Sequence, residues 1–130
     1  MTKQERAEMY RKYLTEEGYA PKIDDDGDVT FKYEGRYYFI AVDQNDEEFF
    51  QLVFPNFWPI ESDAERDKVA KVALQATAKT KVAKVFPVHD NTWALIEMFC
   101  SPPEVFKAVF RRSLSALQAS VEHFRQGMHE

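Results

Sequence analysis

The sequence predicts an α+β fold, with residues 1–130 forming a single domain. Two observations lead to this fold class. Apolar residues recur at three- and four-residue spacings in three segments, and they alternate or run together in five shorter segments bounded by turn residues. The predicted order is helix, three-strand antiparallel meander, helix, two-strand hairpin, helix. Consecutive hairpins imply a largely antiparallel five-stranded sheet with helices covering one face or its ends.

The first half of the chain supplies the first helix and the meander. Ala7, Tyr10 and Leu14 follow a helical spacing within residues 3–17. Gly18 ends this helix, because glycine adopts positive φ at no steric cost. An extended piece at 19–23 and an acidic turn at 24–28 precede predicted strands at 28–33, 36–42 and 48–54, which are separated by turns at 34–35 and 43–46.

The second half supplies the second helix, the hairpin and the third helix. Ser62 and Glu65 fit a capping box that starts the second helix. The hairpin strands are predicted at 82–88 and 92–99, with a turn at 89–91 between them. The predicted buried stripe of the second helix is Val69, Val72, Ala73 and Ala76, and the apolar face of the long third helix, opened by residues 101–103, is Phe106, Val109, Phe110, Ser113, Leu117, Val121 and Phe124.

Composition excludes several classes of protein. The chain has 45% apolar residues, 30% charged residues and a net charge of −5, as globular proteins do. Cys100 is the one cysteine, so no disulfide framework can form within a single copy. The charged start of the chain lacks the apolar run of a signal peptide, and no stretch is long and apolar enough for a membrane helix. We therefore expect a cytoplasmic protein that does not bind membranes.

Charge is distributed unevenly along the chain. Residues 1–65 hold 7 basic and 16 acidic side chains, whereas residues 66–130 hold 10 basic and 6 acidic ones. The basic second half could form a solvated lysine face or a surface for a protein partner. We expect no nucleic-acid binding, because the acidic remainder of the chain would repel the phosphates and no recognised nucleic-acid motif is present.

No residue pattern announces a metal, a cofactor or a catalytic centre. Aligning Gly27 to the glycine of a calcium loop would place Lys22 at the first ligand position, so the acidic residues 24–28 are interpreted as a solvated turn. The four glycines are too widely spaced for a phosphate-binding loop. We therefore predict no catalytic, cofactor-binding or metal-binding residues. The alternative is a small enzyme of unknown reaction with a pocket near His89, Glu97 and Cys100.

The richest apolar segment extends from the third predicted strand into the loop after it, over residues 49–60. A strand hides only one face in a single core, so some of these side chains lack an obvious place in it. Large aromatic residues in a loop are enriched at protein interfaces, but they can also cover the protein's own sheet. Both interpretations remain open for the four candidate protein-binding residues, which are Phe49, Val53, Phe57 and Trp58.

The stretch YLTEEGYAPKIDDDGDVTFKYEGRYYFIAV, at residues 13–42, resembles the bacterial YbjN-like family. That family's fold is similar to the class I type III secretion chaperones. The resemblance extends to the helix, strand pair and helix that follow. It implies a small dimeric protein that holds an extended partner segment against apolar grooves, and it implies no enzyme activity. The basic second half of this chain departs from the acidic surface of such chaperones.

The functional expectation is a noncatalytic protein-binding or chaperone-like module. It would hold an apolar or extended partner segment, and it would form a homodimer. Surplus aromatic residues and the opposite charges of the two halves favour association of two copies. We expect no cofactor.

Overall fold

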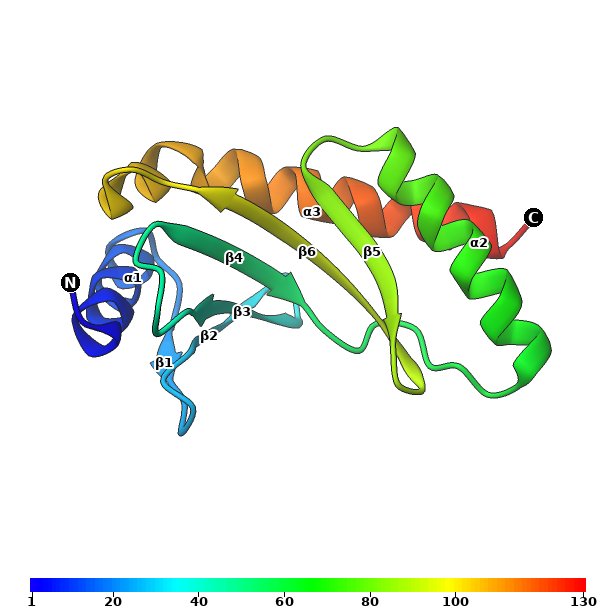
Figure 1. Cartoon of the computed structure of the whole chain (residues 1–130), viewed down its shortest axis with the longest axis horizontal. Coiled ribbons are helices and arrows are strands. Elements are labelled where there is room, and N and C mark those ends of the chain that lie inside the picture. Colours follow the sequence, from blue (N-terminus) through cyan, green and yellow to red (C-terminus); the bar gives the residue numbers. More distant parts are fainter. The chain divides into compact units, whose positions relative to one another are not determined.

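The computed structural model describes all 130 residues and confirms the predicted α+β fold (Figure 1). The order of helices and strands is also as predicted. The elements are α1 (Lys3–Glu16), β1 (Lys22–Ile23), β2 (Val29–Tyr33), β3 (Arg36–Val42), β4 (Phe49–Phe54), α2 (Asp63–Lys79), β5 (Ala83–Val88), β6 (Asn91–Phe99), the 3-10 helix η1 (Pro103–Val105) and α3 (Phe106–Met128).

The sheet has six strands, in the order β1-β2-β3-β4-β6-β5, whereas the sequence predicts five. The additional strand, β1, has only two residues, which are too few to show an alternating pattern. The pairs β1–β2, β2–β3, β3–β4 and β5–β6 are antiparallel, as consecutive hairpins require. None of the helices combines the length and the apolar composition that a membrane crossing requires.

The chain divides into two compact units. The first unit comprises Met1–Val53 and Glu97–Phe110, and the second comprises Phe54–Ile96 and Arg111–Glu130. Strands β4 and β6 and helix α3 contribute residues to both units. That the whole chain behaves as one domain stays a prediction.

Helix α1 of the first unit begins with a capping box that sequence reasoning missed. Thr2 Oγ1 accepts a hydrogen bond from Glu5 N at 3.0 Å, and Glu5 Oε1 accepts one from Thr2 N at 2.9 Å. The pair satisfies two backbone N–H groups at the helix start. The helix ends at Glu16, one residue before the predicted end, and Gly18 follows with a φ of 93°. The role predicted for Gly18 is therefore confirmed.

An aromatic cluster forms the core of the first unit. Tyr10 of α1 lies against Phe50 of β4 and Phe106 of α3, with ring centroids 6.1 and 4.7 Å apart. Phe110 of α3 meets Phe31 of β2 at 5.9 Å. All five side chains are at most 1% exposed. Helix α1 and the start of α3 thus pack on the same face of the sheet.

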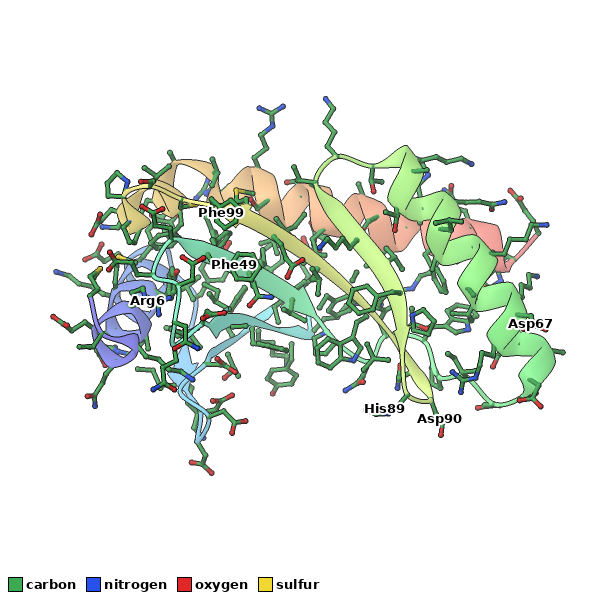
Figure 2. All side chains as sticks on the ribbon, in the orientation of Figure 1. Arg6, Phe49, Asp67, His89, Asp90 and Phe99 are labelled. Atoms are coloured by element: carbon green, nitrogen blue, oxygen red, sulfur yellow. The ribbon has the colours of Figure 1, made fainter.

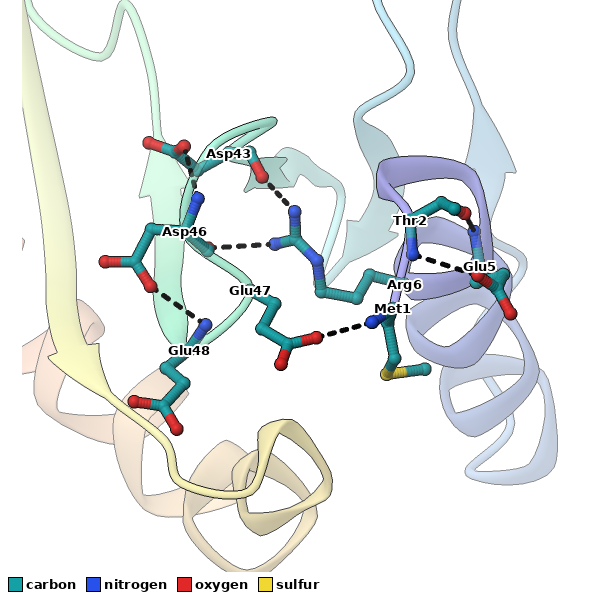
Figure 3. Close-up of polar contacts among 8 residues, drawn as sticks. All are labelled: Met1, Thr2, Glu5, Arg6, Asp43, Asp46, Glu47 and Glu48. Atoms are coloured by element: carbon teal, nitrogen blue, oxygen red, sulfur yellow. Dashed lines mark hydrogen bonds and ion pairs between the residues drawn. The ribbon is translucent and has the colours of Figure 1, made fainter.

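Arg6 is a charged side chain buried beside this core, at 1% exposure. Its two terminal nitrogens donate to the backbone carbonyls of Asp43 and Asp46, in the turn between β3 and β4 (Figure 3). No ion pair involves this guanidinium, and its Nε has no hydrogen-bond partner. The side-chain carboxylates of Asp43 and Asp46 instead accept hydrogen bonds from backbone N–H groups within the turn. Arg6 therefore attaches α1 to the turn through peptide groups rather than through an opposite charge.

In the second unit, α2 begins at the predicted place but with only half of the predicted capping box. Ser62 Oγ accepts from Glu65 N at 3.1 Å. Glu65 Oε1, however, accepts from Glu61 N at 2.7 Å instead of from the N–H of Ser62. The Glu65 side chain thus accepts from the residue before Ser62, because the backbone N–H of Glu61 also needs an acceptor near the helix start. The predicted stripe of α2 is buried in full.

Helix α3 carries the predicted apolar face, although Val109 is only half-buried. A short 3-10 helix precedes it, so α3 itself begins at Phe106. In the second unit, Gly127 of α3 meets Val72 of α2 closely. A Cβ atom added at Gly127 would lie 2.6 Å from Val72 Cγ1, so glycine is required for the two helices to approach this far.

We expect Phe110→Ala to lower the free energy of unfolding by about 3–5 kcal/mol, because it removes a fully buried ring from the aromatic cluster. Lys71→Ala, on the exposed side of α2, should change it by less than about 0.5 kcal/mol. Urea titrations of the two variants measure both values. Equal losses would show that the helix faces are assigned wrongly.

Asp28 connects the start of β2 to the end of β3. Its Oδ1 accepts a hydrogen bond from Val42 N at 2.8 Å. Burial raises the pKa of this carboxyl above its usual value, with a smaller opposing effect from the Val42 hydrogen bond. The native state therefore holds the proton more tightly than the unfolded chain does. The contribution of this group to stability is largest at low pH and declines as pH rises through the folded pKa.

Asp28→Asn retains an oxygen acceptor for Val42 but carries no charge to desolvate. We expect this variant to be at least as stable as the natural chain near pH 7, and to lose that advantage at about pH 4. Asp28→Ala should lose about 1–3 kcal/mol near pH 7, because the Val42 N–H is left without its acceptor. Urea titrations at both pH values provide the test. An advantage of Asp28→Asn that grows toward low pH would contradict the raised pKa.

Candidate functional site

The sheet of the first unit has one face without the aromatic core. Along β3, the buried Tyr38 and Ile40 alternate with residues that point to the other side. The register pairs Lys32 with Tyr37 and Ala41 with Gln51 on that side. We call it the open face, and define it in the first unit by Lys22, Lys32, Tyr37, Phe49, Gln51, Glu97 and Phe99.

Phe49 and Phe99 form an aromatic pair at one corner of the open face. Phe49 begins β4 and Phe99 ends β6, and the two side chains lie near each other (Figure 2). Their ring centroids are 5.9 Å apart with an interplanar angle of 42°. Phe99 is 75% exposed. Full burial of a phenylalanine side chain is favourable by about 1.5–3 kcal/mol. A partner that covered the Phe99 ring would gain much of this free energy.

A hydrogen-bonded pair lies next to these rings. Gln51 Nε2 donates to Glu97 Oε2 at 2.7 Å across β4 and β6. Gln51 is two residues from Phe49, and Glu97 is two residues from Phe99, so the polar pair and the aromatic pair occupy the same face. The open face therefore offers an apolar anchor with a carboxylate beside it.

The opposite corner of the open face combines an aromatic ring with basic side chains. Tyr37 is 67% exposed, and Lys32 Nζ lies 5.6 Å from the centroid of its ring. Lys22 of β1 is exposed and is paired in register with Thr30, on the same face. Neither Lys22 nor Lys32 belongs to an ion pair.

The four predicted binding residues have different surroundings. Phe49 lies on the open face, and Val53 is 2% exposed, so Val53 has no surface to offer a partner. Phe57 and Trp58 direct their rings to Phe124 of α3, at centroid distances of 5.3 and 5.6 Å. These two loop residues pack within the second unit, as the own-core interpretation expects. Phe49, Phe57 and Trp58 are all half-buried, and the binding role of the four residues stays a prediction.

Sequence reasoning missed Tyr37 and Phe99. The sequence shows that the strand 36–42 is apolar on both faces, but it does not show that helices cover only one of those faces in this part of the sheet. Phe99 gave no signal, because the last residue of a strand has no fixed burial.

The free edge of β5 in the second unit is protected. The hydroxyl of Thr77 in α2 binds both backbone groups of Val85. Thr77 Oγ1 accepts a hydrogen bond from Val85 N at 2.9 Å and donates one to Val85 O at 3.3 Å. Pro87 further along the same strand has no N–H group. A partner strand therefore finds few free backbone groups at this edge.

The alternative hypothesis is a small enzyme with a pocket near His89, Glu97 and Cys100. His89 lies in the β5–β6 turn with a φ of 52°, and Cys100 follows the other end of β6. Burial raises the pKa of the Cys100 thiol, which opposes formation of the nucleophilic thiolate. Glu97 accepts from Gln51, as described above. No group of three or more His, Cys, Asp or Glu residues is arranged to hold a metal ion.

A cavity of about 460 Å³ lies between α1 and the acidic turn of the first unit. Two of the charged side chains that line it, Lys3 and Asp24, form hydrogen bonds with the turn. Lys3 Nζ donates to Asp26 O at 2.8 Å, and Asp24 Oδ1 accepts from the backbone N–H groups of Asp26 and Asp28. The predicted turn at 24–28 is confirmed, and its first carboxylate stabilises the turn.

No family model, no curated protein and no solved structure matches the chain. We therefore infer function from the chain's own side chains. Tyr37 and Phe99 are its two strongly exposed aromatic residues, and both belong to the open face.

The open-face assignment predicts opposite results for two phenylalanines in neighbouring strands. Phe99→Ala should change the free energy of unfolding by less than about 1 kcal/mol, because its ring is mostly in water. Phe50→Ala removes a fully buried ring and should cost about 3–5 kcal/mol. Thermal or urea unfolding measures both. A large loss for Phe99→Ala would mean that this ring is part of the core.

Proposed function

We propose that this protein is a noncatalytic binding module that holds an apolar or extended partner segment on the open face. The observation that carries the proposal is the Phe49–Phe99 pair, in which Phe99 is 75% exposed and Phe49 is half-buried. Aromatic residues are enriched in the cores of protein interfaces, where their large rings contribute much of the binding energy. The protected edge of β5 favours binding on a sheet face over addition of a strand at that edge.

The resemblance of residues 13–42 to the YbjN-like family supports the same proposal. We propose a bacterial, cytoplasmic protein of that family, with a type III secretion chaperone-like fold and a chaperone-like role. Because sites rather than folds decide activity, the exposed side chains are the stronger support.

We also propose that the protein is a homodimer. The acidic first half and the basic second half of the chain suit a two-fold interface, in which one patch meets its complement twice. Apolar burial would have to supply most of the free energy, since exposed ion pairs contribute only about 0–1 kcal/mol each.

Photo-crosslinking tests the binding proposal directly. With benzoylphenylalanine in place of Phe99, the full chain in cells should crosslink to another polypeptide upon irradiation, and Phe49→Ala should reduce the yield severalfold. The same photoreactive residue in place of Leu74, which is 72% exposed on α2, provides a control with equal exposure. Crosslinking at 74 but not at 99 would contradict a role for the open face.

Light scattering tests the dimer. We expect about twice the mass of one 15.2 kDa chain at micromolar concentration, in both low and high salt, because apolar contacts are not screened. A single-chain mass in both buffers would contradict the dimer. A dimer in low salt only would mean that charge, rather than apolar burial, holds it together.

A further inference from the structure

The two corners of the open face differ in chemistry, and the proposed function does not account for this difference. Its aromatic corner, Phe49 and Phe99, has the Glu97 carboxylate beside it. Its other corner has Lys22 and Lys32, which are exposed and in no ion pair. An apolar site with an acidic neighbour thus faces a basic site across the strands of one unit.

The register sets the separation of the two corners. The row of Lys22 and Thr30 continues through Phe39 to Val53 of β4, and Val53 is four residues from Phe49. At about 3.3 Å per residue along a strand and about 4.8 Å between strands, Phe49 and Lys22 are about 20 Å apart. About six residues of extended chain would span this distance.

We propose that the open face selects an extended polypeptide segment with an aromatic or large apolar residue at one end and acidic residues about six positions away. This inference rests on the proposed function and adds the chemistry of the partner. The apolar residue packs on Phe49 and Phe99, and the acidic residues pair with Lys22 and Lys32. Electrostatic complementarity of this kind contributes specificity more than affinity.

Selection of displayed peptides on the full chain tests the proposal. The probe is a library of random peptides of about twelve residues, long enough to span both corners. We expect enriched peptides to combine an aromatic or large apolar residue with two acidic residues about six positions away. Fluorescence anisotropy of an enriched peptide then measures binding to three variants: Phe49→Ala with Phe99→Ala, Lys22→Glu with Lys32→Glu, and Lys71→Glu as a charge reversal outside the open face.

The proposal requires that reversal of Lys22 and Lys32 weakens binding by on the order of tenfold, whereas Lys71→Glu leaves it unchanged. Binding should also weaken as salt is raised, because these charges are exposed. Circular dichroism confirms that each variant is folded. Both lysines project from the surface, so their reversal should not disturb the core.

Different failures have different meanings. Enriched peptides that lack acidic residues, and that bind the Lys22 and Lys32 variant as tightly as the natural chain, would overturn this inference but leave the proposed function intact. No enrichment, or peptides that bind equally well without Phe49 and Phe99, would overturn both. A dimer that dissociates when Phe49 and Phe99 are replaced would identify a second copy as the occupant, and would also overturn the inference.

Discussion

The packing of two helical segments on one side of the sheet is the constraint on which the rest of the first unit depends. Tyr10 from α1 and Phe106 from α3 meet over Phe50 of β4, with all three rings buried. A β-sheet has two faces, and side chains alternate between them. Because both helical segments occupy one face, every strand residue whose side chain points to the other face must contact another partner or water.

The open face follows from that constraint, and its composition differs from that of an ordinary solvated face. A sheet with one wet face usually alternates apolar residues inside with polar residues outside. Here the outer positions include Tyr37, Phe49 and Phe99 together with lysines and one carboxylate. An exposed aromatic ring gains less from folding than a buried one does, and the proposed partner segment would cover these rings.

The free edge of β5, unlike the open face, is covered. Thr77 occupies both backbone groups of Val85, and Pro87 removes a donor, so the edge is closed to a further strand. In the second unit, the loop aromatics Phe57 and Trp58 are likewise packed on Phe124. Sites that could associate without specificity are thus covered there, whereas Phe99 in the first unit is exposed.

The helices, the strands and most turns are predictable from the sequence, because they depend on local features. Alternation identified β2, helical spacing identified α1, and Gly18 ended that helix at a φ of 93°. Only the two-residue β1 was missed as a strand, because it is too short for a pattern.

Which apolar residues are buried becomes clear only from the packing of the helices on the sheet. Alternation shows that Tyr37 and Phe39 share a face, but not whether a helix packs on that face. For the same reason, the sequence could not separate Val53, which is buried, from Phe99, which is exposed, or show that Phe57 and Trp58 pack on Phe124. From the sequence, an arginine in an amphipathic helix is expected at the surface. Arg6 is buried because the turn at 43–46 packs against it. Burial depends on contacts between segments far apart in the chain, which local spacing does not encode.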